Sequence, residues 1–394
     1  MPALPKKRFQ DFGRELDPSA FGPVPQAESE KRNRPIPSKT AKASGGPFFR
    51  LWLFFLVFAL AFALAGSGGE ASAKIDDETA PLPKKEIVVY TALTATTAQL
   101  PLLGALAAGW PADGTVKIEF WKNMEDLRAL VLAGQGDVWI GHLETLARAA
   151  SRGAPVRLAA ATVWRKFYFV SRPLAAAPDG TATYPASVEE LLALTAAKGE
   201  TIATAPQNSP SEEMLKKILG PSYPLRPEAL PPQQLVLEMI RGQKKAALLP
   251  EPLASSLVRR DPELKIIGSL EEEYARRFGG PSLIPQAGVA VHEKLASERP
   301  DLVKSLLALM TRSVDELQGD PQKMLLLLPA EARAAIGDEA LLDSLTVEPL
   351  IIKSASDAKS EIDYYLSLAA PDLVAPAEGA GERRLPETFI WSAE

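Results

Sequence analysis

The sequence predicts an α/β protein organised around a largely parallel sheet that helices cover. The segment Leu130 to Val170 shows the pattern, because it contains a helix, a short apolar strand, a second helix and two further apolar strands. Gly134 and Gly136 end the first helix, and the strand Asp137 to Gly141 runs directly into the polar start of the next helix. Such βαβ units imply a covered parallel sheet, and ligands bind beyond the carboxyl ends of its strands.

The same alternation continues through the chain from residue 86. Short apolar runs bounded by glycine, proline or polar residues indicate buried strands, and apolar positions spaced by three or four residues indicate helices. Ser187 and Glu190 form a capping box at one helix start, and Gly199 ends that helix. The expected strands are 86–91, 115–120, 137–141, 156–162, 201–205, 246–249, 264–268 and 283–291. The expected helices include 124–133, 187–198, 212–219, 231–241, 300–317, 321–328, 330–336 and 358–368.

The N-terminal part has a different composition. Residues 1–49 are rich in proline and basic residues, which predicts a disordered head. Residues 50–73 hold an uncharged apolar run followed by Ala71-Ser72-Ala73, which is typical of a secretory signal peptide. The segment is either cleaved after Ala73 or retained as a membrane anchor through residues 50–66, and residues 74–85 form a linker. Both alternatives place the following chain outside the cytoplasm, because the basic flank stays inside.

Composition excludes several classes of function. The net charge of −5 gives no reason to expect a nucleic-acid partner. The absence of cysteine excludes disulfides, thiolate metal sites and a cysteine nucleophile, and two histidines make a histidine metal cluster improbable. We find no G-x-S-x-G or H-E-x-x-H motif. We therefore expect no enzyme activity, no cofactor and no metal site.

The order of the elements resembles the extracytoplasmic solute-binding proteins of ABC importers, in the group that binds nitrate, sulfonate, taurine and thiamine pyrimidines. The resemblance covers roughly residues 86 to 340, and it depends on the order and spacing of several segments. These segments are 132–138 (LAGQGDV), 149–156 (AASRGAPV), 201–219, 251–254 (EPLA) and 287–317.

The resemblance implies a type II periplasmic binding protein with two α/β lobes joined by two crossover strands. Lobe 1 would comprise residues 86–172 and 282–394, and lobe 2 residues 173–281, with hinge strands near 166–173 and 280–290. A monomer of this kind would capture a small anion, nitrate-, sulfonate- or taurine-like, or a heterocycle between its lobes. It would hand the solute unaltered to an ABC permease in the inner membrane. The alternative is a membrane-anchored sensor or interaction module with the same fold.

The expected ligand-binding residues follow strands or open helices, and each has a structural alternative. Helix capping would explain the threonines after the first strand, Asn123 and Ser209 equally well. The Trp164 indole either stacks on a planar ligand or packs in the core. Arg165 and Lys166 could neutralise a sulfonate or carboxylate, but such a pair is more often solvated, and we leave both out of the expected site. The helix start Glu271 to Glu273 is expected to be solvated. The expected ligand-binding residues are Thr94, Thr96, Thr97, Asn123, His142, Glu144, Thr162, Trp164, Gln207, Asn208, Ser209, Glu251 and Gln286.

Overall fold

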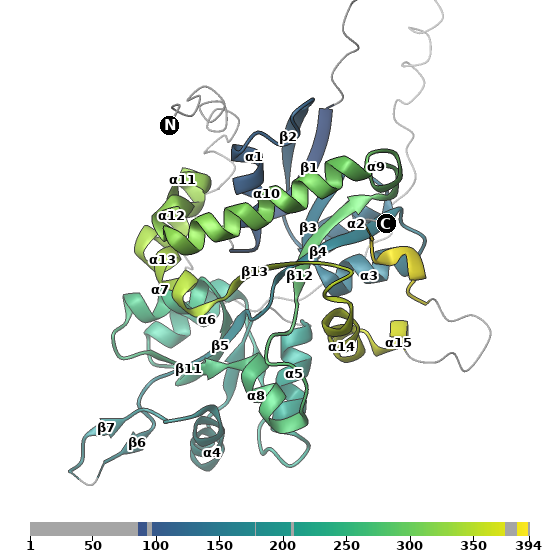
Figure 1. Cartoon of the computed structure of the whole chain (residues 1–394). Helices are drawn as coiled ribbons and strands as arrows, with labels where there is room; N and C mark the ends of the chain where they lie inside the picture. The colour runs from purple at the N-terminus through teal and green to yellow at the C-terminus, as the bar shows by residue number, and fades with distance from the viewer. Residues whose placement is uncertain (1–85, 93–96, 178, 206–208, 375–383, 393–394) are drawn as a thin grey trace, which may run out of the picture. The chain divides into compact units, whose positions relative to one another are not determined.

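The computed structural model describes residues 86–92, 97–177, 179–205, 209–374 and 384–392, all of which belong to one compact unit, Pro83–Glu394 (Figure 1). The predictions for the head, for the signal or anchor segment and for the linker lie outside these residues. Within the described residues, no helix is both long enough and apolar enough to cross a membrane.

The first sheet has six strands in the order β13-β4-β12-β3-β1-β2. The neighbours β1, β2 and β3 run parallel, and β12 runs antiparallel to both β3 and β4. The strand bounds are β1 Glu86–Ala92, β2 Thr115–Trp121, β3 Val138–His142, β4 Val156–Val163, β12 Ala287–His292 and β13 Leu350–Ser354. The strands β1 to β4 therefore share one direction, as the sequence predicts for βαβ units.

The second sheet has five strands in the order β11-β5-β10-β8-β9. Here β8 runs parallel to β9 and β10, whereas β5 runs antiparallel to β10 and β11. The bounds are β5 Phe167–Ser171, β8 Ile202–Thr204, β9 Glu228–Ala229, β10 Ala246–Pro250 and β11 Lys265–Ser269. A two-stranded hairpin, β6 Ala175–Ala176 and β7 Ala182–Thr183, occupies the proline-bounded connection after β5.

Helices follow most of the strands, and these helical connections allow strands such as β1, β2 and β3 to run parallel. The first-sheet connections contain η4 Thr97–Gln99, α1 Leu100–Ala107, α2 Met124–Leu132, α3 Leu143–Ser151, α9 Glu293–Glu298 and α10 Pro300–Gly319. The second-sheet connections contain α4 Val188–Lys198, α5 Pro210–Leu219, α6 Pro232–Ile240, α7 Leu253–Arg260 and α8 Leu270–Phe278. The C-terminal helices are η5 Pro321–Lys323, α11 Met324–Leu327, α12 Ala330–Ile336, α13 Asp338–Val347, α14 Lys359–Ala369, α15 Pro371–Val374 and η6 Glu387–Phe389.

Local signals in the sequence explain several element boundaries. The Ser187 hydroxyl accepts the Glu190 N–H at 3.1 Å while the Glu190 carboxylate accepts the Ala186 N–H at 2.7 Å, so two donors at the start of α4 are satisfied. Gly136 precedes β3 with φ +100°, and a Cβ there would lie 2.6 Å from the Tyr90 ring. Glycine is required at that position for both its conformation and its space.

Three clusters of buried apolar side chains cover the sheets. The largest contains Trp139 from the first sheet and Phe169 and Leu248 from the second, so one core continues across both sheets. A second cluster lies between the first sheet and α10, with Val89 and Leu306 among its members. The third belongs to the second sheet and its helices α6 and α7.

The C-terminal segment contacts both sheets. It supplies β13 to the first sheet, where Leu350 pairs with Val163. On the second sheet, Arg259 of α7 forms ion pairs of 2.7 Å with Glu339 and Asp343 of α13. The Tyr364 hydroxyl of α14 donates to the carbonyl of Gly279, which follows α8, at 3.0 Å.

The α/β fold class is confirmed, although both sheets are mixed where the sequence predicted a largely parallel one, and the chain crosses between the sheets after β4 and again before β12. The sequence analysis missed β13 and α13, which lie between the expected helices 330–336 and 358–368. The strand β13 pairs with the edge of β4 through Leu350, Lys353 and Ser354, a tertiary contact that the local pattern does not specify.

Candidate functional site

Because of the direction in which the strands run, six segments of the chain meet at one edge of the first sheet. Since β1 to β4 run the same way, their carboxyl ends share that edge, and the antiparallel strands β12 and β13 begin there. Ala287 at the start of β12 lies opposite both His142 and Val163. The residues after β3 and β4 therefore lie beside those before β12 and β13.

The second sheet presents the corresponding edge at the same crossover. Pro250 at the end of β10 pairs with Phe167 at the start of β5, and the Glu251 N–H donates to the Lys166 carbonyl at 2.9 Å. The three residues Trp164 to Lys166 connect the end of β4 to the start of β5. Both edges consequently meet at this crossover, which is the kind of place where open α/β sheets bind ligands.

Lys166 is the centre of a buried polar cluster at this point. Its Nζ lies 3.0 and 3.2 Å from the two carboxylate oxygens of Glu348 and donates to the Thr97 hydroxyl at 3.2 Å. The Lys166 side chain is 13% exposed and that of Glu348 is 2% exposed. Burial raises the pKa of Glu348, and the Lys166 charge opposes that effect.

The position of Glu348 is fixed by both sheets. The residue precedes β13 of the first sheet, and the preceding carbonyl, that of Val347, accepts a 2.8 Å hydrogen bond from the Tyr168 hydroxyl of β5. The Glu348 carboxylate is thereby held beside Lys166 at the crossover, although the two residues are about 180 positions apart in the chain.

Glu251 contributes a second buried carboxyl group to the cluster. It is 1% exposed, and it accepts hydrogen bonds from the Ser255 N–H at 3.2 Å and the Ser255 hydroxyl at 2.9 Å. Burial raises the pKa of Glu251 to about 7, although Ser255 and the Lys166 charge act in the opposite direction. Glu251 therefore lies near its own titration midpoint at neutral pH.

His142 ends β3 at the same edge. Burial, followed by the positive charge of Lys166, lowers the pKa of His142 to about 4. The imidazole is neutral at physiological pH, so it offers the site a hydrogen-bonding group without a charge.

Glu271 at the start of α8 is the third buried carboxyl group. One of its oxygens accepts the Lys166 N–H at 2.9 Å, the Phe167 N–H at 3.4 Å and the side-chain amide of Gln286. Its other oxygen, Oε2, is buried and has no hydrogen-bond partner among the residues that the structure describes. Burial raises the pKa of Glu271 to about 7. Glu271 holds the crossover backbone in place and leaves one acceptor open.

The expectation of a solvated helix start at Glu271 to Glu273 was wrong for two of the three residues. Glu271 is fully buried and Glu273 is 5% exposed, whereas Glu272 is exposed and pairs with Arg165. The first turn of α8 packs against the crossover, so successive residues point to opposite environments. A run of identical charges in the sequence does not reveal that difference.

The structure brings four of the expected ligand-binding residues to the crossover, namely Thr97, His142, Glu251 and Gln286. Trp164 and Thr162 are also there, with 0% and 2% exposure, and neither the indole N–H nor the Thr162 hydroxyl has a partner in the described part of the chain. The Trp164 ring belongs to the largest apolar cluster, with Lys353 Nζ 4.8 Å from its centroid.

The remaining expected residues have other local roles or lie outside the description. Asn123 is exposed and caps α2 by accepting the Asp126 N–H at 2.9 Å, and Ser209 caps α5 by accepting the Glu212 N–H at 3.3 Å. Glu144 forms an ion pair with Arg148 on α3. Thr94, Thr96, Gln207 and Asn208 lie outside the residues that the structure describes.

Sequence reasoning missed Lys166 and Glu348. Lys166 was expected to be solvated, yet its position between two apolar strand runs, 156–163 and 167–171, is a usable signal. Only three residues connect these two buried strands, so the backbone at the basic pair cannot extend far from the core into solvent. Glu348 precedes an unrecognised strand and gave no such signal.

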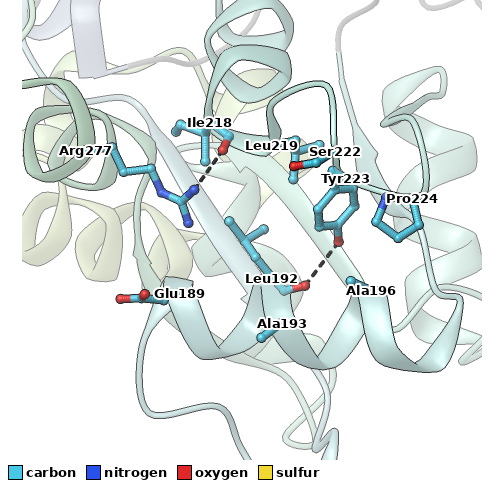
Figure 2. Close-up of a pocket in the computed structure, with 10 residues that line it drawn as sticks. All are labelled: Glu189, Leu192, Ala193, Ala196, Ile218, Leu219, Ser222, Tyr223, Pro224 and Arg277. Carbon is cyan, nitrogen blue, oxygen red and sulfur yellow. Dashed lines mark hydrogen bonds between the residues drawn. The ribbon is translucent and has the colours of Figure 1, made fainter.

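A separate hollow of about 330 Å³ lies on the second-sheet side between α4, α5 and the turn after α5 (Figure 2). Most of its lining is apolar, and two of its polar side chains, Arg277 and Tyr223, are already engaged. Arg277 donates to the Ile218 carbonyl at 2.8 Å and pairs with Glu273, and the Tyr223 hydroxyl contacts Leu192 and Thr195. None of the expected ligand-binding residues lines this hollow. It has fewer open polar groups than the crossover cluster.

Among the residues that the structure describes, no group of three or more potential metal-ligating side chains comes together. The buried carboxyl groups of the crossover cluster instead accept hydrogen bonds from Lys166, from Ser255 and from backbone N–H groups.

The sequence matches no family model and no curated protein. Several similar solved structures are named as ABC transporter proteins or as periplasmic binding proteins. An ABC transporter protein from Parabacteroides distasonis is similar at a TM-score of 0.55 and 16% identity, over 78% of this chain and 98% of that chain. The periplasmic aliphatic sulphonate binding protein SsuA from Escherichia coli gives 0.55 and 11%, over 77% and 92%. The periplasmic nitrate-binding protein NrtA from Synechocystis PCC 6803 gives 0.53 and 14%, over 75% and 83%.

The class that the fold defines is therefore the two-lobed α/β fold of periplasmic binding proteins, and the fold class predicted from the sequence is confirmed. The identities of 11 to 16% define the fold alone.

Proposed function

We propose that this chain is the extracytoplasmic substrate-binding component of an ABC importer, and that it captures a small solute at the crossover between its two lobes. The observation that carries the proposal is the buried polar cluster around Lys166, at the edges where the two sheets meet. A few fixed polar groups in an otherwise apolar setting are typical of small-molecule sites. The fold supports the proposal, because similar solved structures are named as sulphonate- and nitrate-binding proteins.

In this proposal the chain performs no chemistry on the solute. Lobe 1 comprises residues 86–172 and 282–394, and lobe 2 residues 173–281, with the chain crossing between them near 166–173 and 280–290. Ligand binding stabilises a closed arrangement only because that arrangement makes contacts that an open one lacks. A monomer then delivers the solute to a permease in the membrane, outside the cytoplasm, whether or not an N-terminal segment anchors it.

A thermal-shift screen of the full chain tests the proposal. The compounds are nitrate, alkylsulfonates, taurine, small carboxylic acids, amines and pyrimidines. A ligand at one hundred times its Kd stabilises the folded state by about 2.7 kcal/mol, which gives a measurable rise in Tm. We expect at least one class to raise Tm and to be recovered unaltered from the complex. Turnover of a bound compound, or no shift with any compound, would refute the proposed function.

A pair of lysine variants locates the site. Lys166→Met should abolish the shift given by an active compound. Lys244→Met is the matched control. Lys244 is also largely buried, with a side-chain exposure of 18%, but it pairs with Glu228 of β9, away from the crossover. Equal loss in both variants would show that the effect is not local to the crossover.

A further inference from the structure

The crossover cluster holds more acidic than basic groups. Two basic side chains, Lys166 and Arg165, lie beside four acidic ones, Glu251, Glu271, Glu272 and Glu348. Arg165 pairs with the exposed Glu272, and its charge also acts on Glu271, whereas the Lys166 charge acts on the other two buried carboxyl groups, Glu251 and Glu348. The His142 imidazole adds no charge.

Lys166 is already engaged. Its Nζ is within 3.2 Å of both Glu348 oxygens and of the Thr97 hydroxyl. A simple anion such as nitrate would have to displace Glu348 from Lys166, and it would then take up the Lys166 charge that acts on the buried carboxyl groups of Glu348 and Glu251. Removing one partner of a buried ion pair is strongly unfavourable.

Glu251 and Glu271 retain the capacity to accept further hydrogen bonds. Within the described residues, the Glu251 side chain accepts hydrogen bonds only from Ser255, one at each carboxylate oxygen. A carboxylate has about four acceptor positions, so half of them are open. Glu271 Oε2 is fully buried and has no partner in the described part of the chain, although the other oxygen of the same carboxyl group is bonded to the Lys166 backbone. These open acceptors are a second observation, independent of the charge count.

We propose that the solute carries a cationic nitrogen group, an ammonium or an amidinium, which donates hydrogen bonds to Glu251 in the crossover cluster. The group supplies the positive charge that the buried carboxyl groups lack, and its N–H donors fill acceptor positions that protein groups leave open. An anionic part of the same solute, where present, binds beside Thr97 and Lys166. A taurine-like zwitterion fits this arrangement, whereas nitrate does not. The inference depends on the proposed function and narrows its solute class.

Matched pairs of compounds test the inference on the full chain. Each pair shares a scaffold and differs by one ammonium group: ethanesulfonate and taurine, propionate and β-alanine, and ethanol and ethanolamine. We expect the ammonium-bearing member of at least one pair to raise Tm, and its partner to have no effect at the same concentration. Stabilisation by nitrate, or equal stabilisation by both members of the active pair, would overturn the inference and leave the proposed function in place. No shift with any compound would count against both.

A charge-removing variant locates the ammonium group. Glu251→Gln keeps the size of the side chain and an acceptor for Ser255 but removes the charge. For the active amine, Kd should rise roughly ten- to hundredfold, the range expected for the loss of a hydrogen bond to a charged group. Glu228→Gln is the control, because Glu228 pairs with Lys244 outside the cluster. An unchanged Kd in Glu251→Gln would overturn the assignment, and the compound pairs decide the charge class even if this variant does not fold.

Discussion

The buried pair between Lys166 and Glu348 gives a direct test of the crossover cluster through Lys166→Met. The substitution removes the basic partner of a carboxylate that is 2% exposed and leaves its two hydrogen bonds of 3.0 and 3.2 Å unmade. Breaking a buried pair from one side costs about 3–5 kcal/mol, whereas replacing both partners by apolar residues is often nearly neutral. We therefore expect the free energy of unfolding to fall by about 3–5 kcal/mol in the single variant. The double variant Lys166→Met with Glu348→Leu should recover most of this loss.

Urea unfolding followed by tryptophan fluorescence measures these differences. The pH dependence separates charge from packing. Burial already raises the pKa of Glu348 while Lys166 opposes it, so removing Lys166 raises that pKa further. A carboxyl group whose pKa is raised by folding favours the folded state at low pH and loses that contribution as pH increases. The deficit of the single variant should therefore be smallest in acid. Lys244→Met, which breaks a pair with the partly exposed Glu228, should cost no more than about 1 kcal/mol. A double variant as unstable as the single one would refute the reasoning.

Three further predictions concern the free energy of unfolding of variants at the buried residues Glu251, Gly288 and Trp164. The stability advantage of the protein over Glu251→Gln should fall by about 3 kcal/mol between pH 4.5 and pH 7, because burial raises the pKa of Glu251 to about 7; a pH-independent difference in urea unfolding would contradict this. Gly288→Ala should lower the free energy of unfolding by about 1–3 kcal/mol, since its Cβ would lie 2.3 Å from the Ala160 carbonyl oxygen, and Gly319→Ala, which has open space, is the control. Trp164→Ala should cost about 3–5 kcal/mol because the indole is fully buried; a loss of ligand affinity without a loss of stability would contradict its packing role.

The sequence was sufficient for the fold class because that depends on local periodicity. Strands β1 to β4 follow one another with helices between them, and glycine, proline and capping residues mark their ends. The edge of the first sheet that gathers polar residues follows from the same parallel order. For this reason Thr97, His142, Glu251 and Gln286, each beside a strand end, could be predicted before any geometry was known.

The centre of the cluster could not be found in the same way. Whether Lys166 is solvated or buried depends on Glu348, and Glu348 reaches it only because β13 adds to the edge of β4 and Tyr168 holds the Val347 carbonyl. These contacts join residues separated by about 180 positions in the chain. A local pattern contains no information about such a partner, so a charged residue between two strands was assigned to solvent.

The C-terminal segment constrains any hinge motion that the proposed function requires. It is hydrogen-bonded to the first sheet through β13, and it contacts the second sheet through the Tyr168–Val347 and Tyr364–Gly279 hydrogen bonds. A rotation of one sheet against the other about the crossover would stretch those bonds unless the segment itself moves. In the proposed function, a solute that enters the cluster lies beside Glu348, which directly follows the Val347 carbonyl that Tyr168 holds. Ligand binding would then be coupled to the relative position of the sheets, because both would depend on this segment.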